Sequence, residues 1–143
     1  MTLTLLAHVF ATLFLVGLIW FVQIVHYPLF SIVGKDQFST YEERHQRQTT
    51  WVVGPAMLVE LITAVMLLKE VPDNSQSLAW GGVLLIAVIW LSTGLLSMPA
   101  HRSLAVEYST GAYQKLVWTN WIRTVAWSIR GLLVLMMVYR CMC

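Results

Sequence analysis

Four long apolar runs dominate the pattern of hydrophobic and polar positions along the chain. A helix needs roughly 20 mostly apolar residues to cross a bilayer, so each run predicts a transmembrane helix. The short connections between the runs favour antiparallel neighbours, which predicts an all-α membrane protein with an up-down-up-down four-helix transmembrane bundle. The runs are Leu3 to Val25, Trp51 to Leu68, Leu78 to Met98 and Leu116 to Val138.

The composition agrees with this pattern. Of the 143 residues, 58% are hydrophobic and only 11% are charged, whereas soluble domains carry about 25% charged residues. Four spans leave no room for a separate soluble domain, so we expect residues 1–143 to form one domain in a lipid bilayer. The first run lacks a basic leading segment and a small-residue cleavage site, so we expect it to remain as a span. The net charge of +2 gives no indication of a nucleic-acid partner.

The connections divide the predicted bundle into two ends. The longer ones, 27–50 and 99–115, lie at one end, here called side B, whereas both termini lie at side A with the loop 71–77. Lysine and arginine near span ends are enriched on the cytoplasmic side of membranes, and side B carries more of them. We therefore expect side B in the cytoplasm and both termini outside. The residues counted are Lys35, Arg44, Arg47, Arg102 and Lys115 at side B, and Lys69 and Arg140 at side A.

The side-B connections carry helical signals, so we expect helical extensions of the bundle there. Pro28 is expected to end the first helix, and Asp36 is a candidate N-cap for a helix that leads into the second span. Pro99 is expected to kink or break the third helix, and Gly111 to stop the short helix that follows it.

Three of the four histidines gather at side B, each from a different predicted helix: His26, His45 and His101. Glu42 precedes His45 in a Glu-x-x-His spacing, which places both side chains on one helix face, as in di-iron carboxylate bundles. Imidazole and carboxylate ligands suit iron, copper or zinc, so these four residues predict a non-haem metal site. A haem b held by His26 and His101 is one alternative, and polar caps without a metal are another. His8 is expected to lie alone at side A.

Polar residues inside the spans indicate a second candidate layer, because each is costly unless it faces the bundle interior. In the fourth run one helical stripe contains Asn120, Arg123, Trp127 and Arg130. At about 1.5 Å per residue, Glu60 of the second run can pair with either arginine. Two guanidiniums and one carboxylate leave a positive pocket suited to an anionic or enolate-like oxygen. A purely structural ion pair is the equal alternative.

Three motifs add to these observations: HYPLF after the first run, SMPAH after the third and NWIRT early in the fourth. In these motifs, and in its length and topology, the chain resembles the small four-span membrane proteins grouped with anthrone-oxygenase-like enzymes, largely a domain of unknown function. The resemblance implies oxidation of an aromatic, polyketide-like substrate, and it carries over His26, His101, Asn120 and Arg123. The Glu-x-x-His pair and Glu60 are not assigned by it.

Together these features predict a metal-dependent membrane oxidoreductase or oxygenase that acts on an apolar, aromatic or phenolic small molecule. The side-B histidines and their neighbouring glutamate would hold the metal, Arg123 would stabilise an oxyanion, and Glu60 would orient that arginine or move a proton. The substrate would contact Asn120, Arg130 and Trp127. The alternative is a non-catalytic binding or transport subunit of a homo-oligomer, in which the glutamate and both arginines form a charged site.

Overall fold

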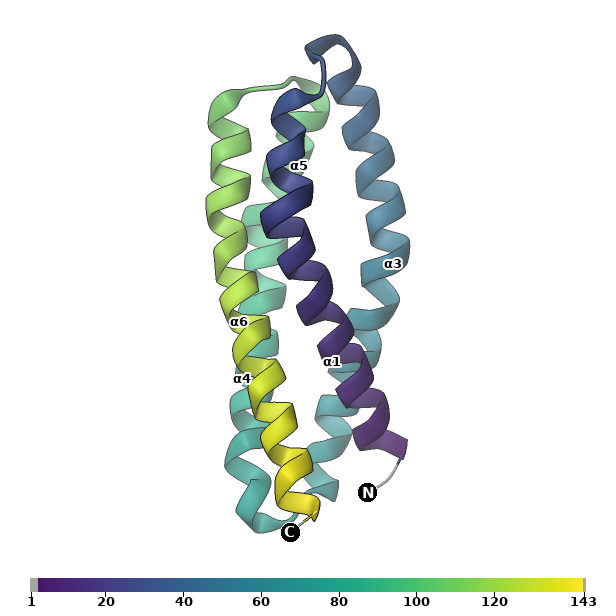
Figure 1. Cartoon of the computed structure of the whole chain (residues 1–143), viewed down its shortest axis with the longest axis vertical. Helices are drawn as coiled ribbons and strands as arrows, with labels where there is room; N and C mark the ends of the chain where they lie inside the picture. The colour runs from purple at the N-terminus through teal and green to yellow at the C-terminus, as the bar shows by residue number, and fades with distance from the viewer. Residues whose placement is uncertain (1–2, 143) are drawn as a thin grey trace.

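The computed structural model describes residues 3–142 as four long helical segments packed into a bundle (Figure 1). The first segment joins α1 (Leu3–Phe21), a π-helix (Val22–His26), the single turn α2 (Tyr27–Leu29) and a 3-10 turn (Phe30–Ile32). The second segment is α3 (Lys35–Glu70). The third follows a 3-10 turn (Asp73–Ser75) and joins α4 (Gln76–Ser92), a second π-helix (Thr93–Ser97) and α5 (Met98–Val106). The fourth is α6 (Thr110–Met142).

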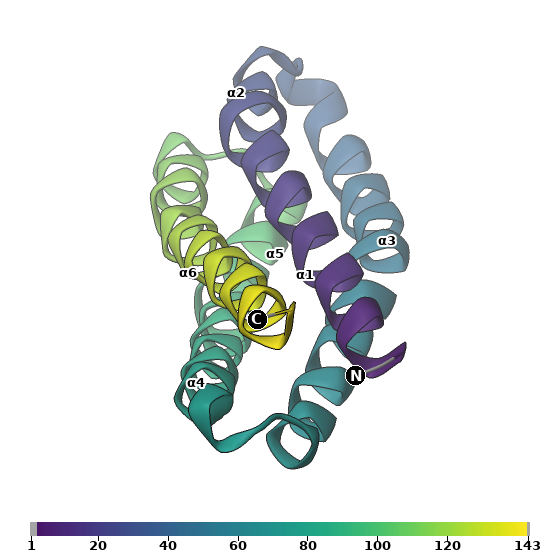
Figure 2. The ribbon, with the colours of Figure 1, turned by 60° about the horizontal axis from the view of Figure 1, so that its bottom comes forward.

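The segments run antiparallel. Both ends of the chain lie beside the α3–α4 turn, and the other two connections lie at the opposite end (Figure 1). In the second view α1 lies between α3 and α6, while α4 packs against α6 and α3 (Figure 2). These contacts confirm the predicted all-α, up-down-up-down bundle. The four segments are long and apolar enough to cross a membrane, as expected of a multi-pass membrane protein.

The outer surface of the bundle is apolar along the spans. Phe10, Ile62, Leu84 and Leu132, one from each long segment, keep more than half of their side-chain surface exposed. Exposed apolar side chains at this density are a liability in water, whereas lipid chains are an equally apolar neighbour. The interior holds the buried polar residues, which include Thr12, Gln23, Glu42, Glu60, Asn120, Arg123 and Arg130.

Pro28 and Pro99 do not end their helices. Tyr27 and Met98, the residues before Pro28 and Pro99, each donate the backbone N–H to the carbonyl five residues back, which defines a π-turn. The wider turn shifts the carbonyl that the proline ring would otherwise strike. The expectation that Pro28 ends the first helix is therefore wrong, and the third segment also continues through its proline without a break.

Two further helix boundaries differ from expectation, the first by two residues and the second by about one turn. The N-cap of α3 is Gly34, and Asp36 lies in the first turn, where its negative charge favours the helix N-terminus. Gly111 does not stop a helix; α5 ends at Val106, and Gly111 lies in the first turn of α6. Both differences arise because a polar or flexible residue is as compatible with a first helical turn as with the position before it.

Candidate functional site

A cavity of about 460 Å³ lies between the long segments in the side-B half of the bundle. Its lining is apolar near the middle of the spans and polar nearer side B. Both π-helices contribute to its wall, and π-turns are frequent at functional sites. Cavities of this volume are typical of sites for small organic molecules. The apolar lining includes Leu15, Ile19, Met57 and Trp127, and the polar lining includes Tyr27, His45, Thr49, His101 and Arg123.

The cavity reaches the surface in two directions. Its lining residues Leu58, Trp90 and Met98 are between 39% and 50% exposed, which places one opening between α3 and the α4–α5 segment, facing lipid. Gln46 and Arg102 line both the cavity and an open groove between α3 and α5 at side B. The cavity is therefore open both on the apolar outer face of the spans and towards side B.

A hydrogen-bonded chain of three side chains crosses the polar end of the cavity. The Tyr27 hydroxyl lies 3.0 Å from His101 Nε2, and His101 Nδ1 lies 2.5 Å from Glu42 Oε1. A carboxylate only accepts, so His101 donates from Nδ1, and neutral His101 accepts at Nε2 from the tyrosine O–H. A hydroxyl held against a histidine, which is in turn held by a carboxylate, is the arrangement by which many enzymes activate a hydroxyl group.

Gln46 fixes the relative position of α3 and α5, which carry Glu42 and His101. One turn after Glu42 on α3, its Nε2 donates to Glu42 Oε1 and to the backbone carbonyl of His101, each at 3.2 Å. Tyr27 is 3% exposed and Glu42 is fully buried, so bulk water does not compete for these bonds. The chain is therefore preorganised before any ligand binds.

His26 and His45 form a second pair beside this chain. His26 Nε2 lies 2.9 Å from His45 Nδ1, and Thr49 Oγ1 lies 3.1 Å from the same nitrogen. The buried ring of Phe30 packs edge-on against both imidazoles, with centroids 5.1 and 5.2 Å away. The His45 ring centroid is 5.4 Å from that of His101. The structure thus brings the three side-B histidines together beside the predicted glutamate.

The donor atoms of this cluster are directed at one another rather than at one central point. Both ring nitrogens of His101 are hydrogen-bonded, and His26 shares a bond with His45. Among residues 3–142, no group of three or more His, Cys, Asp or Glu side chains has the geometry to hold a metal ion. The donor types suit a metal, but the observed arrangement is a hydrogen-bond network, whose internal bonds a metal would have to replace.

Arg123 connects α6 to the same network. Its Nη2 donates to the Tyr27 hydroxyl at 3.2 Å and to Asn120 Oδ1. Asn120 in turn donates to Gln23 Oε1 at 2.7 Å, which ties α6 to the π-helix of the first segment. Asn120 is fully buried behind Arg123 and outside the cavity lining, so it positions the arginine rather than meeting a ligand.

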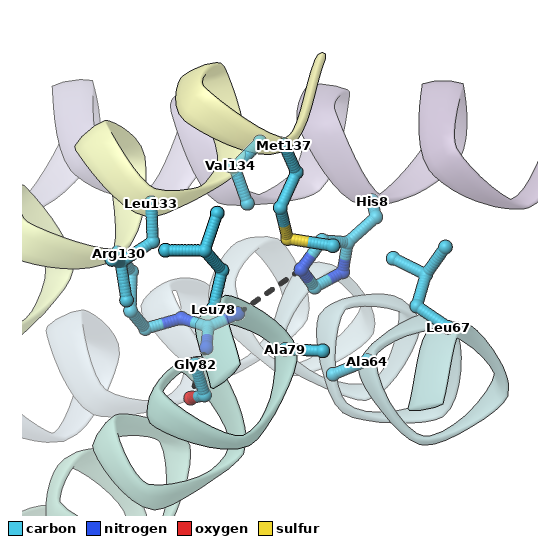
Figure 3. Close-up of a pocket in the computed structure, with 10 residues that line it drawn as sticks. All are labelled: His8, Ala64, Leu67, Leu78, Ala79, Gly82, Arg130, Leu133, Val134 and Met137. Atoms are coloured by element: carbon cyan, nitrogen blue, oxygen red, sulfur yellow. Dashed lines mark hydrogen bonds between the residues drawn. The ribbon is translucent and has the colours of Figure 1, made fainter. Parts of the chain in front are cut away.

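Glu60 and Arg130 belong to a different layer, which we call the clasp. Arg130 Nε donates to Glu60 Oε1 at 2.9 Å. Its Nη1 donates to the Gly82 carbonyl, and its Nη2 lies 3.4 Å from His8 Nε2 (Figure 3). Thr12 and Trp127 donate to the two oxygens of Glu60, at 3.0 and 3.2 Å. All three guanidinium nitrogens and both carboxylate oxygens therefore have partners. The clasp comprises His8, Thr12, Glu60, Thr63, Gly82, Trp127 and Arg130.

The expectation that His8 is isolated is wrong. Its Nδ1 lies 2.8 Å from Thr63 Oγ1, and Thr63 donates its own proton to the Val59 carbonyl at 2.6 Å. His8 therefore donates from Nδ1 and accepts from Arg130 at Nε2, as the neutral ring. The pocket in Figure 3 has room for about 10 Å³, no more than one water. His8 and Thr12 are spaced i, i+4 in an apolar run, which was the sequence signal for a buried polar face.

The predicted site residues thus occupy three kinds of position. Those in the cavity wall are His45, His101, Arg123 and Trp127, while His26, Glu42 and Asn120 lie directly behind the wall, and Glu60 and Arg130 lie in the clasp. Tyr27 and Ser97 are cavity residues that the sequence did not single out as site residues. Their signal was a hydroxyl side chain within two residues of a proline at the side-B end of a span.

No protein-family model matches the chain, and no curated protein or solved structure matches it significantly. The resemblance to anthrone-oxygenase-like proteins therefore stays a prediction. The function has to be argued from the cavity itself: its apolar wall, its openings, and the hydrogen-bonded side chains at its polar end.

Proposed function

We propose that this protein is a membrane enzyme that binds an apolar, aromatic small molecule in the side-B cavity and moves a proton at its phenolic or carbonyl head group. The observation that carries the proposal is the chain Tyr27–His101–Glu42 at the polar end of a 460 Å³ cavity. The aromatic body would lie against the apolar lining, which brings the head group to the tyrosine hydroxyl.

In the proposed reaction Tyr27 passes its proton to His101 Nε2, and Glu42 stabilises the resulting imidazolium through Nδ1–H. Arg123 stabilises the resulting Tyr27 phenolate, because it already donates to the Tyr27 oxygen. That oxygen then removes a proton from an O–H or an acidic C–H of the substrate. The products are a substrate anion and protonated His101, so charge is conserved. Such an anion is electron-rich, and its oxidation by dioxygen would give the activity that the resemblance implies.

A metal-dependent oxidoreductase is the second candidate. Two observations favour it: Glu42 Oε2 is buried without a partner in the described chain, and His26 and His45 bring two ring nitrogens within 2.9 Å. With His101, these residues would hold iron, copper or zinc, and the metal would supply the oxidation chemistry. Haem b on two histidines is the variant of this candidate.

Metal content and the visible spectrum of the purified protein test this second candidate. Stoichiometric metal that falls in both His45→Ala and His101→Ala supports it, with His8→Ala as the matched control in the other layer. A haem spectrum selects the variant. Protein that turns over substrate without bound metal and is unaffected by chelation rejects both.

The transport alternative requires Glu60, Arg123 and Arg130 to form one charged site, in an oligomer. In the described chain Arg123 bonds to Tyr27 and Asn120, whereas Arg130 bonds to Glu60 in the clasp. This separation favours the enzyme over the transport subunit. We also propose, from the excess of lysine and arginine at side B, that the cavity opens towards the cytoplasmic leaflet.

Deuterium exchange tests the proposed proton transfer. Anthrone, an apolar tricyclic ketone with an acidic methylene group, is incubated in heavy water with detergent-solubilised protein, alongside a set of apolar phenols and ketones. Mass spectrometry measures deuterium uptake and oxidation products. We expect exchange above the buffer rate, and a loss of about 100-fold or more in Tyr27→Phe. Tyr139→Phe, the same change at an exposed side-A position, should keep the wild-type rate. Equal exchange by wild type and Tyr27→Phe would contradict the proposal.

A further inference from the structure

The unpartnered polar atoms of the bundle gather in one place. In the part of the chain that the structure describes, three buried side-chain nitrogen or oxygen atoms lack a hydrogen-bond partner: Glu42 Oε2, Ser97 Oγ and Arg123 Nε. Ser97 and Arg123 line the cavity, and Glu42 is bonded to His101, which lines it too. Buried polar groups are nearly always paired, so the two unpartnered donors in the cavity wall, Ser97 and Arg123, indicate a ligand that supplies acceptors.

Arg123 also has no carboxylate in contact with it among the described residues. Arg123 is 9% exposed, and its two hydrogen-bond partners, Tyr27 and Asn120, are neutral. Neither buried carboxylate contacts Arg123: Glu60 pairs with Arg130, and Glu42 bonds to neutral His101. A buried guanidinium without a bonded carboxylate is costly inside a membrane bundle, and ionisable groups of this kind mark binding sites.

The rest of the cavity lining also carries positive rather than negative charge. Among the described residues that line the cavity, Arg102 and Arg123 are cationic and none is acidic. Arg102 continues into the side-B groove, where Arg47 adds a positive charge and Glu43 a negative one. A low-dielectric cavity lined by one sign of charge concentrates ions of the opposite sign. The ligand that fits this field is an anion.

We propose that the cavity binds an amphiphilic carboxylic acid, with its carboxylate at Arg123 and its apolar body towards Trp127. The carboxylate supplies the acceptors that Arg123 Nε and the Ser97 hydroxyl lack, and it gives the guanidinium a directly bonded anion. One buried guanidinium matches a single negative charge, which favours a carboxylate over a phosphate monoester with nearly two. The acid would keep the orientation it has in a bilayer, since its head group faces side B and its body lies among the spans.

This inference names the substrate class of the cavity and rests on the proposed function for turnover, but not for binding. Its test compares two probes that differ in the head group, anthracene carboxylic acid and the anthracene methanol with the same ring position. Trp90 and Trp127 line the cavity, so saturable energy transfer from tryptophan to anthracene reports binding to the solubilised full chain. We expect the acid to bind on the order of 10- to 100-fold more tightly than the alcohol.

Arg123→Gln should lower the affinity for the acid to that for the alcohol, and Ser97→Ala should weaken acid binding by a smaller factor. Arg140→Gln, at an exposed side-A arginine, is the matched control and should leave both affinities unchanged. Should the glutamine variant fail to fold, Arg123→Lys keeps the charge and should retain part of the preference for the acid. Equal affinities in wild type overturn the inference, as does an acid preference that survives in Arg123→Gln.

The two proposals fail separately. A Tyr27→Phe variant that binds the acid but no longer catalyses exchange supports both. Exchange that depends on Tyr27, without any preference for the acid probe, overturns only the inference about the carboxylate. A preference for the acid that depends on Arg123, without catalysed exchange of any probe, overturns the proposed function and leaves a carboxylate-binding protein.

Discussion

Arg130 and Arg123 lie two helical turns apart on one face of α6, but their surroundings differ. Arg130 has a carboxylate partner in Glu60, and all three of its guanidinium nitrogens are bonded. Arg123 has two neutral hydrogen-bond partners, and its Nε has no partner among the described residues. It also lines the side-B cavity. A buried ion pair whose hydrogen bonds are all made fixes how helices pack. A buried arginine with an unpaired N–H, by contrast, can still bind a ligand. The residue type alone therefore does not reveal the role of a buried arginine, whereas the number of its hydrogen-bond partners does.

Removing Arg130 should have the largest effect on stability. Arg130→Met leaves the buried Glu60 carboxylate without its cation, which costs about 3–5 kcal/mol of unfolding free energy. Arg123→Met strands no partner of opposite charge, but it leaves the buried Asn120 carbonyl oxygen without its donor, so it should cost about 1–3 kcal/mol. Thermal unfolding in detergent, followed by tryptophan fluorescence, measures both. Similar losses from the two variants would remove the distinction between clasp and cavity layer.

A second substitution, at Glu60, should restore most of the unfolding free energy lost in Arg130→Met. Glu60→Gln combined with Arg130→Met removes both charges, so the double variant should return to within about 1–2 kcal/mol of wild type. The double-variant cycle then reports the strength of coupling between the two residues. Simple addition of the two single losses would show that Glu60 and Arg130 do not act as a pair.

His8→Ala should have an intermediate effect on stability and none on the ligand. The change removes one acceptor from Arg130 and one donor from Thr63, which costs about 1–3 kcal/mol. Affinity for the anthracene acid should stay at the wild-type value, because His8 lies outside the cavity lining. Weaker acid binding in a folded His8→Ala protein would mean that the two layers are coupled.

Two glycines allow the smallest and most closely matched comparison. A Cβ at Gly82 would lie 3.3 Å from Arg130 Nη1, whereas a Cβ at Gly94, in the cavity wall, would meet nothing within 4 Å. Gly82→Ala should therefore cost about 1 kcal/mol, since the guanidinium has to move from its bonds. Gly94→Ala should be neutral or stabilising by up to about 1 kcal/mol, because alanine is the better helix former. The difference in unfolding temperature between the two variants is the measurement, and the opposite order would contradict it.

The spans and the membership of both polar layers were predictable, because a charged residue in an apolar run is rare enough to mark the bundle interior. The sequence did not predict that Glu60 pairs with Arg130 rather than with Arg123. Depth along a helix follows from counting residues, but rotation about the helix axis depends on how neighbouring helices pack. His8 was misjudged for the same reason, since its partners come from α3 and α6 and no local pattern relates those helices to α1.

Tyr27 was missed because of the π-turn before it. A π-turn contains one residue more than an α-turn, and one residue corresponds to a rotation of about 100°. The faces of the helix before and after Val22–His26 therefore follow different registers. Proline marks such a place in the sequence, but it is equally compatible with a helix end, so the inward direction of Tyr27 required the structure.

The two π-turns also have a mechanical consequence. Each is followed by a proline, which has no N–H to close the next turn, so the backbone there carries fewer hydrogen bonds than an α-helix of the same length. Bending concentrates at residues 22–28 and 93–99, beside the cavity, while the clasp below cross-links all four long segments. We therefore expect the bundle to be rigid at the clasp and more flexible around the side-B cavity. The cavity could then widen for ligands of different size without disturbing the clasp.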